Sequence, residues 1–87
     1  MRLVEAWLAY RLEHGDGPHA AARYLSKQCG KRYQPSRIWE WSHGSRPVPQ
    51  NIAKFMRAEI LPWLMKREGI VNPKTREKLA SILEILI

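Results

Sequence analysis

Apolar residues recur at three- and four-residue steps along most of this chain, which is the spacing of one face of an α-helix. The first apolar stripe is formed by Leu3, Val4, Trp7, Leu8 and Leu12, and Arg2, Glu5 and Arg11 fall on the opposite side. This pattern predicts a helix over about residues 2–14 whose apolar side faces the core. The residues Gly15, Asp16 and Gly17 then end it.

A second apolar stripe predicts a helix from Pro18 to about Cys29. Its apolar positions are Ala21, Ala22, Leu25 and Cys29. Proline suits the first position of a helix, where its missing N–H would have no partner in any case. Gly30 can adopt the left-handed conformation that commonly closes a helix. We interpret Cys29 as a buried small apolar residue at the end of this helix rather than as a nucleophile.

A short third helix is predicted from Pro35 to about His43, with Gln34 as its cap and Gly44 as its end. Ile38 and Trp41 fall on one face of it. These two apolar anchors leave a polar and aromatic front free for other contacts.

The second half of the chain predicts two or three further helices. Residues 50–61 form a fourth helix that packs behind the second and third, and Pro62 either kinks it or begins another helix that stops at Gly69. Asn72 and Pro73 then begin a last helix that runs to about Leu86. Because no strand-like alternation is present, the sequence predicts an all-α bundle of five to six helices.

The net charge of +7 falls entirely on one part of the chain. Between Gly17 and Arg57 there are eight basic residues and a single acidic one, Glu40, whereas the remaining residues hold seven of each sign. A polyanion is the natural partner of such a region, and its affinity should fall steeply with salt.

Residues 18–60 resemble the helix-turn-helix of the Cro and phage-repressor family, the lambda repressor-like DNA-binding domains. The resemblance is carried by Leu25, Ser26 and Gly30 in the first helix of the motif and by Ile38, Trp41, Gly44, Arg46, Pro47 and Pro49 in and after the second. The chain departs from the family in two ways. The stretch from Gly30 to Ile38 is two residues longer than usual, and Ser26 stands where alanine is common.

The resemblance implies that the third helix enters the major groove of DNA. The candidate base-reading residues are Gln34, Ser36, Arg37, Trp39 and Glu40. The candidate phosphate contacts are Arg23, Lys27, Lys31, Arg32, Ser45, Arg46 and Asn51. Glu40 either accepts from a cytosine amino group or pairs with Arg37 or Arg46. Trp39 either lies half-buried at the helix edge or stacks on a thymine methyl or a sugar.

The last predicted helix has more large aliphatic residues than a small domain can bury. We expect residues 70–87 to dimerise the protein through Leu79, Ile82, Leu83, Ile85 and Leu86, which would set two reading helices about 34 Å apart on a palindromic operator. The alternative is that this helix folds back over Trp7 or Trp63 of its own chain.

The sequence has few features that would indicate an enzyme, a cofactor site or a membrane-spanning segment. It has no GxxxxGK, GxGxxG, CxxC or HExxH motif, and His14, Asp16 and His19 lack the spacing of a zinc site, so we interpret them as loop residues. No signal peptide and no apolar run of membrane-spanning length is present, and one cysteine cannot form an internal disulfide. A cytoplasmic location without cofactor or metal is expected.

The leading hypothesis is a sequence-specific transcriptional regulator, a Cro-like repressor of a phage or bacterium that acts as a homodimer. Its DNA-binding domain would span residues 1–69, with the reading unit at about 18–44. A protein-interaction module such as an antitoxin, antirepressor or adaptor is the alternative. Non-specific nucleic-acid binding through charge alone is the third possibility.

Overall fold

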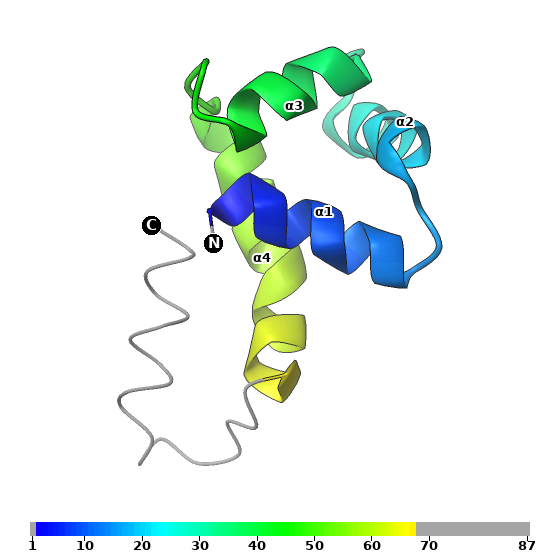
Figure 1. Cartoon of the computed structure of the whole chain (residues 1–87), viewed down its shortest axis with the longest axis vertical. Coiled ribbons are helices and arrows are strands. Elements are labelled where there is room, and N and C mark those ends of the chain that lie inside the picture. Colours follow the sequence, from blue (N-terminus) through cyan, green and yellow to red (C-terminus); the bar gives the residue numbers. More distant parts are fainter. Residues whose placement is uncertain (1, 68–87) are drawn as a thin grey trace.

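The computed structural model describes residues 2–67, and these form four helices and no strand. The helices are α1 (Leu3–Glu13), α2 (Pro18–Cys29), α3 (Pro35–Ser42) and α4 (Gln50–Arg67) (Figure 1). The all-α class and the first four predicted helices are confirmed for this part of the chain. The predicted helix over 73–86 lies outside the described residues.

Helix α1 is the centre of the packing, because α2, α3 and α4 all contact it. Val4, Ala6 and Trp7 of α1 are buried. The core is completed by Ala21, Ala22 and Leu25 of α2, Ile38 and Trp41 of α3, and Ile52, Met56, Ile60 and Leu64 of α4. The expectation that α4 packs chiefly on the second and third helices is therefore wrong: its main contact is α1.

The end of α1 differs from its predicted orientation. The apolar pattern places Leu12 on the core-facing side, yet it is 66% exposed, and it places Arg11 on the solvent side, yet the Arg11 side chain is only 12% exposed. The physical reason is that Arg11 finds two carboxylates, Asp16 and Glu59, inside the bundle. Burying a charge is tolerable only where it is paired and hydrogen-bonded, and this site meets that condition.

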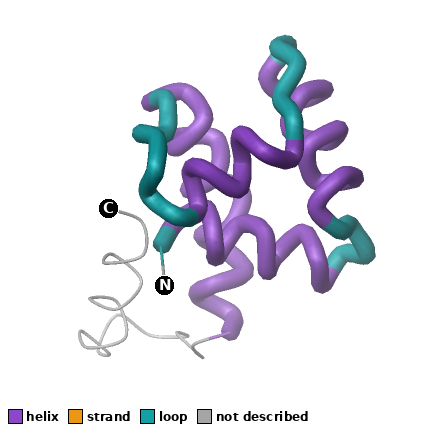
Figure 2. The backbone as a smooth tube through the Cα atoms, turned by 45° about the horizontal axis from the view of Figure 1, so that its top comes forward, coloured by secondary structure: helices purple, strands orange, loops and turns teal. Residues whose placement is uncertain are grey.

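Helix α4 continues through Pro62, so no separate helix begins there within the described residues. Proline removes the hydrogen bond to the carbonyl four residues earlier, which belongs to Ala58. Both Ala58 and Pro62 are exposed, so that carbonyl lies on the side where water can hydrate it. The smooth tube of Figure 2 shows the helices following one another through short loops.

Candidate nucleic-acid interface

Helix α3 is attached to the protein by one face only. Ile38 is 2% exposed and Trp41 is 3% exposed, and the Ser42 hydroxyl, also buried, donates to the Trp39 carbonyl over 2.7 Å. The candidate reading residues Gln34, Ser36, Arg37 and Trp39 are all exposed. The predicted division of this helix into two apolar anchors and an accessible front is therefore present in the structure.

Trp39 stands on the accessible front of α3, where it is 57% exposed. Its ring stacks on His43, with ring centroids 4.0 Å apart and an interplanar angle of 29°. The imidazole Nδ1 is held 2.9 Å from the Trp39 carbonyl oxygen, which fixes the pair at the carboxyl end of α3. The side chain is thus exposed rather than half-buried at the helix edge, and its stacking on a thymine methyl or a sugar stays a prediction.

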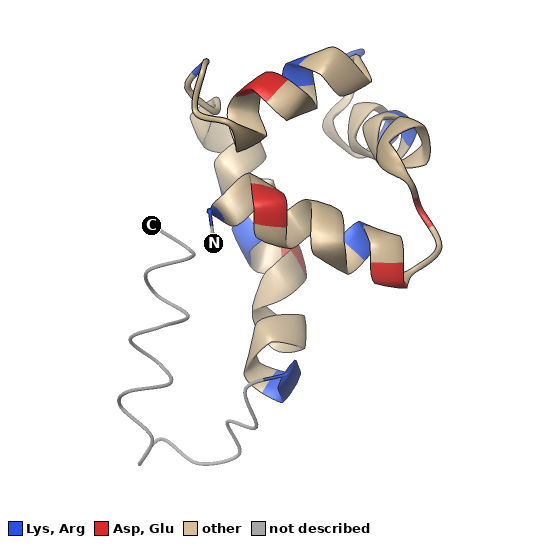
Figure 3. Ribbon diagram, in the orientation of Figure 1, with Lys and Arg blue, Asp and Glu red and all other residues tan. Residues whose placement is uncertain are grey.

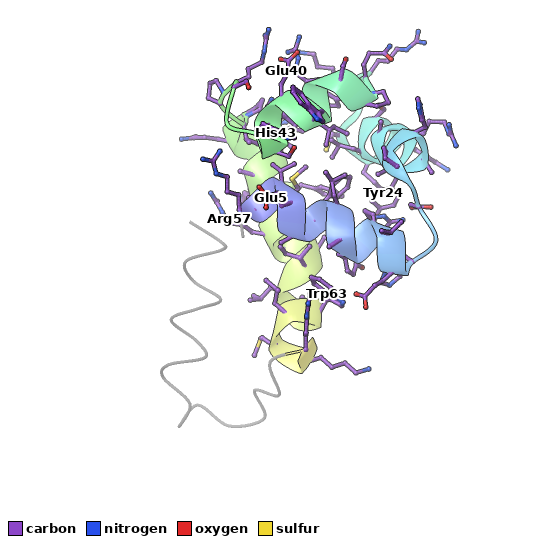
Figure 4. The ribbon with its side chains drawn as sticks, in the orientation of Figure 1. Glu5, Tyr24, Glu40, His43, Arg57 and Trp63 are labelled. Carbon is purple, nitrogen blue, oxygen red and sulfur yellow. The ribbon has the colours of Figure 1, made fainter. Side chains whose placement is uncertain are left out.

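Glu40 is paired on the protein surface. Its Oε2 accepts a hydrogen bond from Nε of Arg46 over 2.7 Å, and Nε of Arg37 lies 3.9 Å from the same oxygen. Figure 4 shows Glu40 on the side of α3 that is turned away from α1. Of the two alternatives left open for Glu40, the surface ion pair is thus the one present here. It holds two arginines at the front of the helix.

The lengthened turn between α2 and α3 is fixed by Ser26. The backbone N–H of Tyr33 donates to the Ser26 Oγ over 2.8 Å, and that hydroxyl donates to the Ala22 carbonyl over 2.7 Å. The Tyr33 ring then packs edge-on against Trp41, with centroids 5.4 Å apart. The extra residues therefore follow a defined path, begun by Gly30, whose φ of 68° is the left-handed conformation predicted for it.

Two hollows flank this turn. One, of about 330 Å³, lies between α2 and the turn and includes Arg23, Ser26, Arg32 and Gln34 in its lining. The other, of about 290 Å³, lies on the α3 side and includes Arg32, Gln34, Ser36 and Arg37. Since Arg32 and Gln34 line both hollows, the two hollows adjoin and bring part of the predicted site together. The predicted site residues that line neither hollow are Lys27, Trp39, Ser45, Arg46 and Asn51.

The structure leaves all seven candidate phosphate contacts accessible: Arg23, Lys27, Lys31, Arg32, Ser45, Arg46 and Asn51. Lys27 lies one helical turn beyond Arg23 on the same side of α2. In Figure 3 the acidic residues lie mostly on α1, the α1–α2 loop and α4, and the one acidic segment of α3 belongs to the Glu40 ion pair.

Sequence reasoning missed Arg2 as a neighbour of α3. Gly44 follows that helix with a φ of 74°, and a β-carbon at this position would collide with the Arg2 guanidinium. The arginine therefore lies beside the carboxyl end of α3, where the helix dipole favours a positive charge. No spacing rule links two residues so far apart in the sequence.

A second feature that the sequence did not reveal is the cluster formed by Trp7, Arg11, Asp16, Tyr24 and Glu59. Glu59 accepts hydrogen bonds from Nε1 of Trp7 over 2.9 Å and from the Tyr24 hydroxyl over 2.5 Å, and Nη1 of Arg11 lies 3.6 Å from it. The Arg11 guanidinium also stacks over the Tyr24 ring at 3.7 Å. This cluster ties α2 to α1 and α4, and so sets where the reading unit stands.

The cluster also shifts a pKa. Burial, followed by the hydrogen bond to Glu59, raises the pKa of Tyr24 to about 12. Burial likewise raises the pKa of the Cys29 thiol, the opposite of the low pKa that a nucleophile needs. Its side chain packs against the core but is half-buried, where the sequence predicts a buried residue.

The loop after α1 has no metal-binding arrangement. Asp16 is bound to Arg11, and Nδ1 of His14 lies 2.8 Å from the Tyr10 carbonyl oxygen. Within residues 2–67, no three His, Cys, Asp or Glu side chains gather as metal ligands would. His14 and Asp16 lie in the loop after α1, as interpreted from the sequence, whereas His19 is the second residue of α2, so the interpretation as a loop residue is wrong for it.

Comparison with known proteins gives no relative: no family model, no curated protein and no solved structure matches this chain. None of the four described helices combines the length and apolar character that crossing a membrane requires. The predicted dimer residues Leu79, Ile82, Leu83, Ile85 and Leu86 lie outside the described residues.

Proposed function

We propose that this protein is a sequence-specific DNA-binding transcriptional regulator that reads the major groove with α3. The observation that supports this most is the front of α3, where Gln34, Ser36 and Arg37 are exposed beside hollows lined by further arginines. Ile38 and Trp41 anchor the helix from behind, so the front can meet a duplex without disturbing the core.

The chemistry of this surface suits DNA in two respects. Arginine matches the O6 and N7 acceptors of guanine bidentately, and glutamine matches the N6 and N7 groups of adenine, so Arg37 and Gln34 supply side chains that discriminate between bases. The surrounding cations neutralise backbone phosphates, which positions the protein without reading sequence. The proposal is supported by the adjoining hollows beside the α2–α3 turn, whose linings include both Arg37 and Gln34 and the basic residues Arg23, Lys31 and Arg32.

The proposed regulator resembles Cro-like repressors and acts as a homodimer in the cytoplasm. Residues 70–87 form its dimerisation element, through the aliphatic residues named above. A single small module seldom provides enough contact area for specific binding, whereas two copies double it and match a palindromic operator. Occupying such an operator, or touching polymerase beside it, would then regulate transcription.

Selection from a random duplex library at near-physiological salt tests this proposal. We expect enrichment of an inverted repeat whose half-sites lie about one helical turn apart. Replacing Ser36, Arg37 and Glu40 together by alanine should abolish the preference while most of the salt-dependent binding remains, and Lys66→Ala, at the far end of α4, serves as the control. No enriched motif, with binding that vanishes as salt rises, would overturn specific reading.

A second candidate function, a module that binds a protein partner, is favoured by a different surface. A hollow of about 780 Å³ at the ends of α1 and α4 has an apolar floor that includes Ala9, Leu12 and Trp63. Leu12 is the most exposed large apolar side chain within residues 2–67. Exposed apolar patches commonly mark interaction sites. If this surface carried the function, the protein would show no preference for any duplex, and Leu12→Glu would abolish partner binding.

A further inference from the structure

The lengthened α2–α3 turn borders a basic hollow that the candidate base-reading residues Ser36 and Arg37 of α3 do not line. The hollow lies on the α2 side of the turn, and Arg23 of α2 and Arg32 of the turn both line it. Among residues 2–67 neither guanidinium pairs with a carboxylate, in contrast to Arg11, Arg37 and Arg46. Two unpaired cations lining one hollow create a strong preference for an anion.

Ser26 fixes the geometry of this hollow. It lines the hollow itself, and its hydroxyl binds both the Ala22 carbonyl of α2 and the N–H of Tyr33, the residue after Arg32. Along the chain, Gly30 and Lys31 are the residues that connect Arg32 to the end of α2. Because Ser26 holds the turn against α2, the distance between the backbones of the two arginines is set before any ligand arrives.

The neighbouring hollow indicates which anion this is. Gln34 and Arg32 line both hollows, and the second one opens onto Ser36 and Arg37 at the front of α3. The first hollow therefore adjoins the surface that would face the backbone of a duplex read by α3. A backbone phosphate fits the site in charge and in its oxygen acceptors, which guanidinium groups match bidentately.

We propose that this hollow seats a single DNA backbone phosphate, bound jointly by Arg23 and Arg32, and that Ser26 is the residue that positions Arg32 for it. This inference rests on the DNA-binding function proposed above. It divides the surface into a phosphate seat on the α2 side of the turn and a base-reading side on α3. The longer turn is then the element that adds the seat.

The salt dependence of DNA binding tests whether the two arginines share one phosphate. The slope of log K against log salt changes by about 0.9 for each phosphate that the protein no longer neutralises. We expect Arg23→Ala plus Arg32→Ala to reduce that slope by about 0.9 in all, with each single variant giving most of the loss in affinity. The fluorescence anisotropy of a labelled duplex, titrated at several salt concentrations, provides the measurement, and Lys66→Ala is the control.

A slope change of about 1.8 in the double variant would mean two separate phosphates, and no change would mean none; either result overturns the shared seat while leaving DNA binding intact. If the unaltered protein binds no duplex at all, the proposed function fails and the seat fails with it. The two failures are thus distinguishable within the same titration.

The role of Ser26 requires its own variants. In a Ser26→Ala background, Arg32→Ala should change affinity much less than it does in the unaltered protein, because the arginine is no longer held in place. Ser26→Thr keeps the hydroxyl and should preserve the full Arg32 effect. Circular dichroism checks that each variant is folded. If Ser26→Ala unfolds, Ser26→Thr alone tests the role: it should keep the salt slope and the DNA affinity of the unaltered protein. Loss of either would overturn the positioning role of Ser26. Equal effects of Arg32→Ala in the Ser26→Ala and unaltered proteins would also overturn it.

Discussion

Two regions of this molecule place their arginines in opposite surroundings. Between α1, α2 and α4, the Arg11 side chain is 12% exposed and meets Asp16 and Glu59. Around the α2–α3 turn, Arg23 and Arg32 are exposed and meet no carboxylate within residues 2–67. A neutralised, desolvated charge holds helices together, whereas a solvated and unpaired one remains available to a polyanion. Arginine therefore stabilises the fold in the first region and is available for binding in the second.

The largest expected effect comes from breaking the buried cluster around Glu59, between α1, α2 and α4. We expect Glu59→Ala to lower the free energy of unfolding by ~3 kcal/mol, because Trp7, Arg11 and Tyr24 lose a shared acceptor in a largely buried site. Urea unfolding followed by circular dichroism measures this. Glu59→Gln keeps one carbonyl oxygen and should lose less. A destabilisation below ~0.5 kcal/mol would contradict the assigned role.

The next largest effect concerns only the exposed surface formed by α3 and the α2–α3 turn. Arg37→Ala should reduce the discrimination between the selected duplex and a scrambled one by ~1–3 kcal/mol, since it removes a bidentate pair with a base. The free energy of unfolding should change by less than ~0.5 kcal/mol, because Arg37 is an exposed surface residue. Anisotropy titrations with both duplexes supply the comparison. Equal weakening on the two duplexes would show that Arg37 contacts only the backbone.

A smaller effect, with its own pH dependence, is expected at Tyr24. Near neutral pH, Tyr24→Phe should cost ~1 kcal/mol of unfolding free energy, because the hydroxyl donates to Glu59. The folded protein holds the phenol proton more tightly than the unfolded chain, with a pKa of about 12 against the ordinary 10.0. This stabilisation is therefore complete below pH 10 and is lost as the pH rises toward 12.

Urea unfolding of both proteins from neutral to alkaline pH measures the Tyr24 effect. The gap between the unaltered protein and Tyr24→Phe should narrow across that interval, and the variant controls for the titration of lysines. A gap that stays constant with pH would mean that folding does not raise the pKa of Tyr24.

The smallest expected effect is at the Glu40 ion pair, whose arginines are paired with a carboxylate but exposed to solvent. Glu40→Gln should change the unfolding free energy by at most ~0.5 kcal/mol, as is usual for an exposed pair. It should raise the affinity for a scrambled duplex, because one repelling charge is removed and Arg37 and Arg46 are released. Glu13→Gln makes the same charge change away from this surface. Similar gains in both variants would contradict a local role for Glu40.

The helix boundaries of the described chain were predictable because their signals are local. Pro18 and Pro35 each open a helix and Gly30 closes one, in agreement with the structure. The inner and outer faces of α3 followed from the spacing of Ile38 and Trp41, since one face must be buried. These inferences needed no knowledge of how the helices pack.

What could not be predicted depends on residues that are distant in the sequence. Arg11 turns inward and Leu12 outward because Glu59, a residue of α4, lies within reach of the guanidinium. Hydrophobic periodicity depends only on which positions are polar and which are apolar, so it predicts that a charged residue faces solvent. The choice of Glu40 partner, the Ser26 bridge and the hollows beside the turn were beyond prediction for the same reason.

The attachment of α3 by one face has a consequence for how this protein can change over generations. Because Ile38, Trp41 and Ser42 carry its packing, the outward residues can be exchanged in many combinations without a new fold having to be found. A mutated descendant therefore stays folded while it samples other targets, which makes divergence of recognition accessible one substitution at a time. The same property makes α3 a suitable position for a combinatorial library that varies Gln34, Ser36, Arg37 and Glu40.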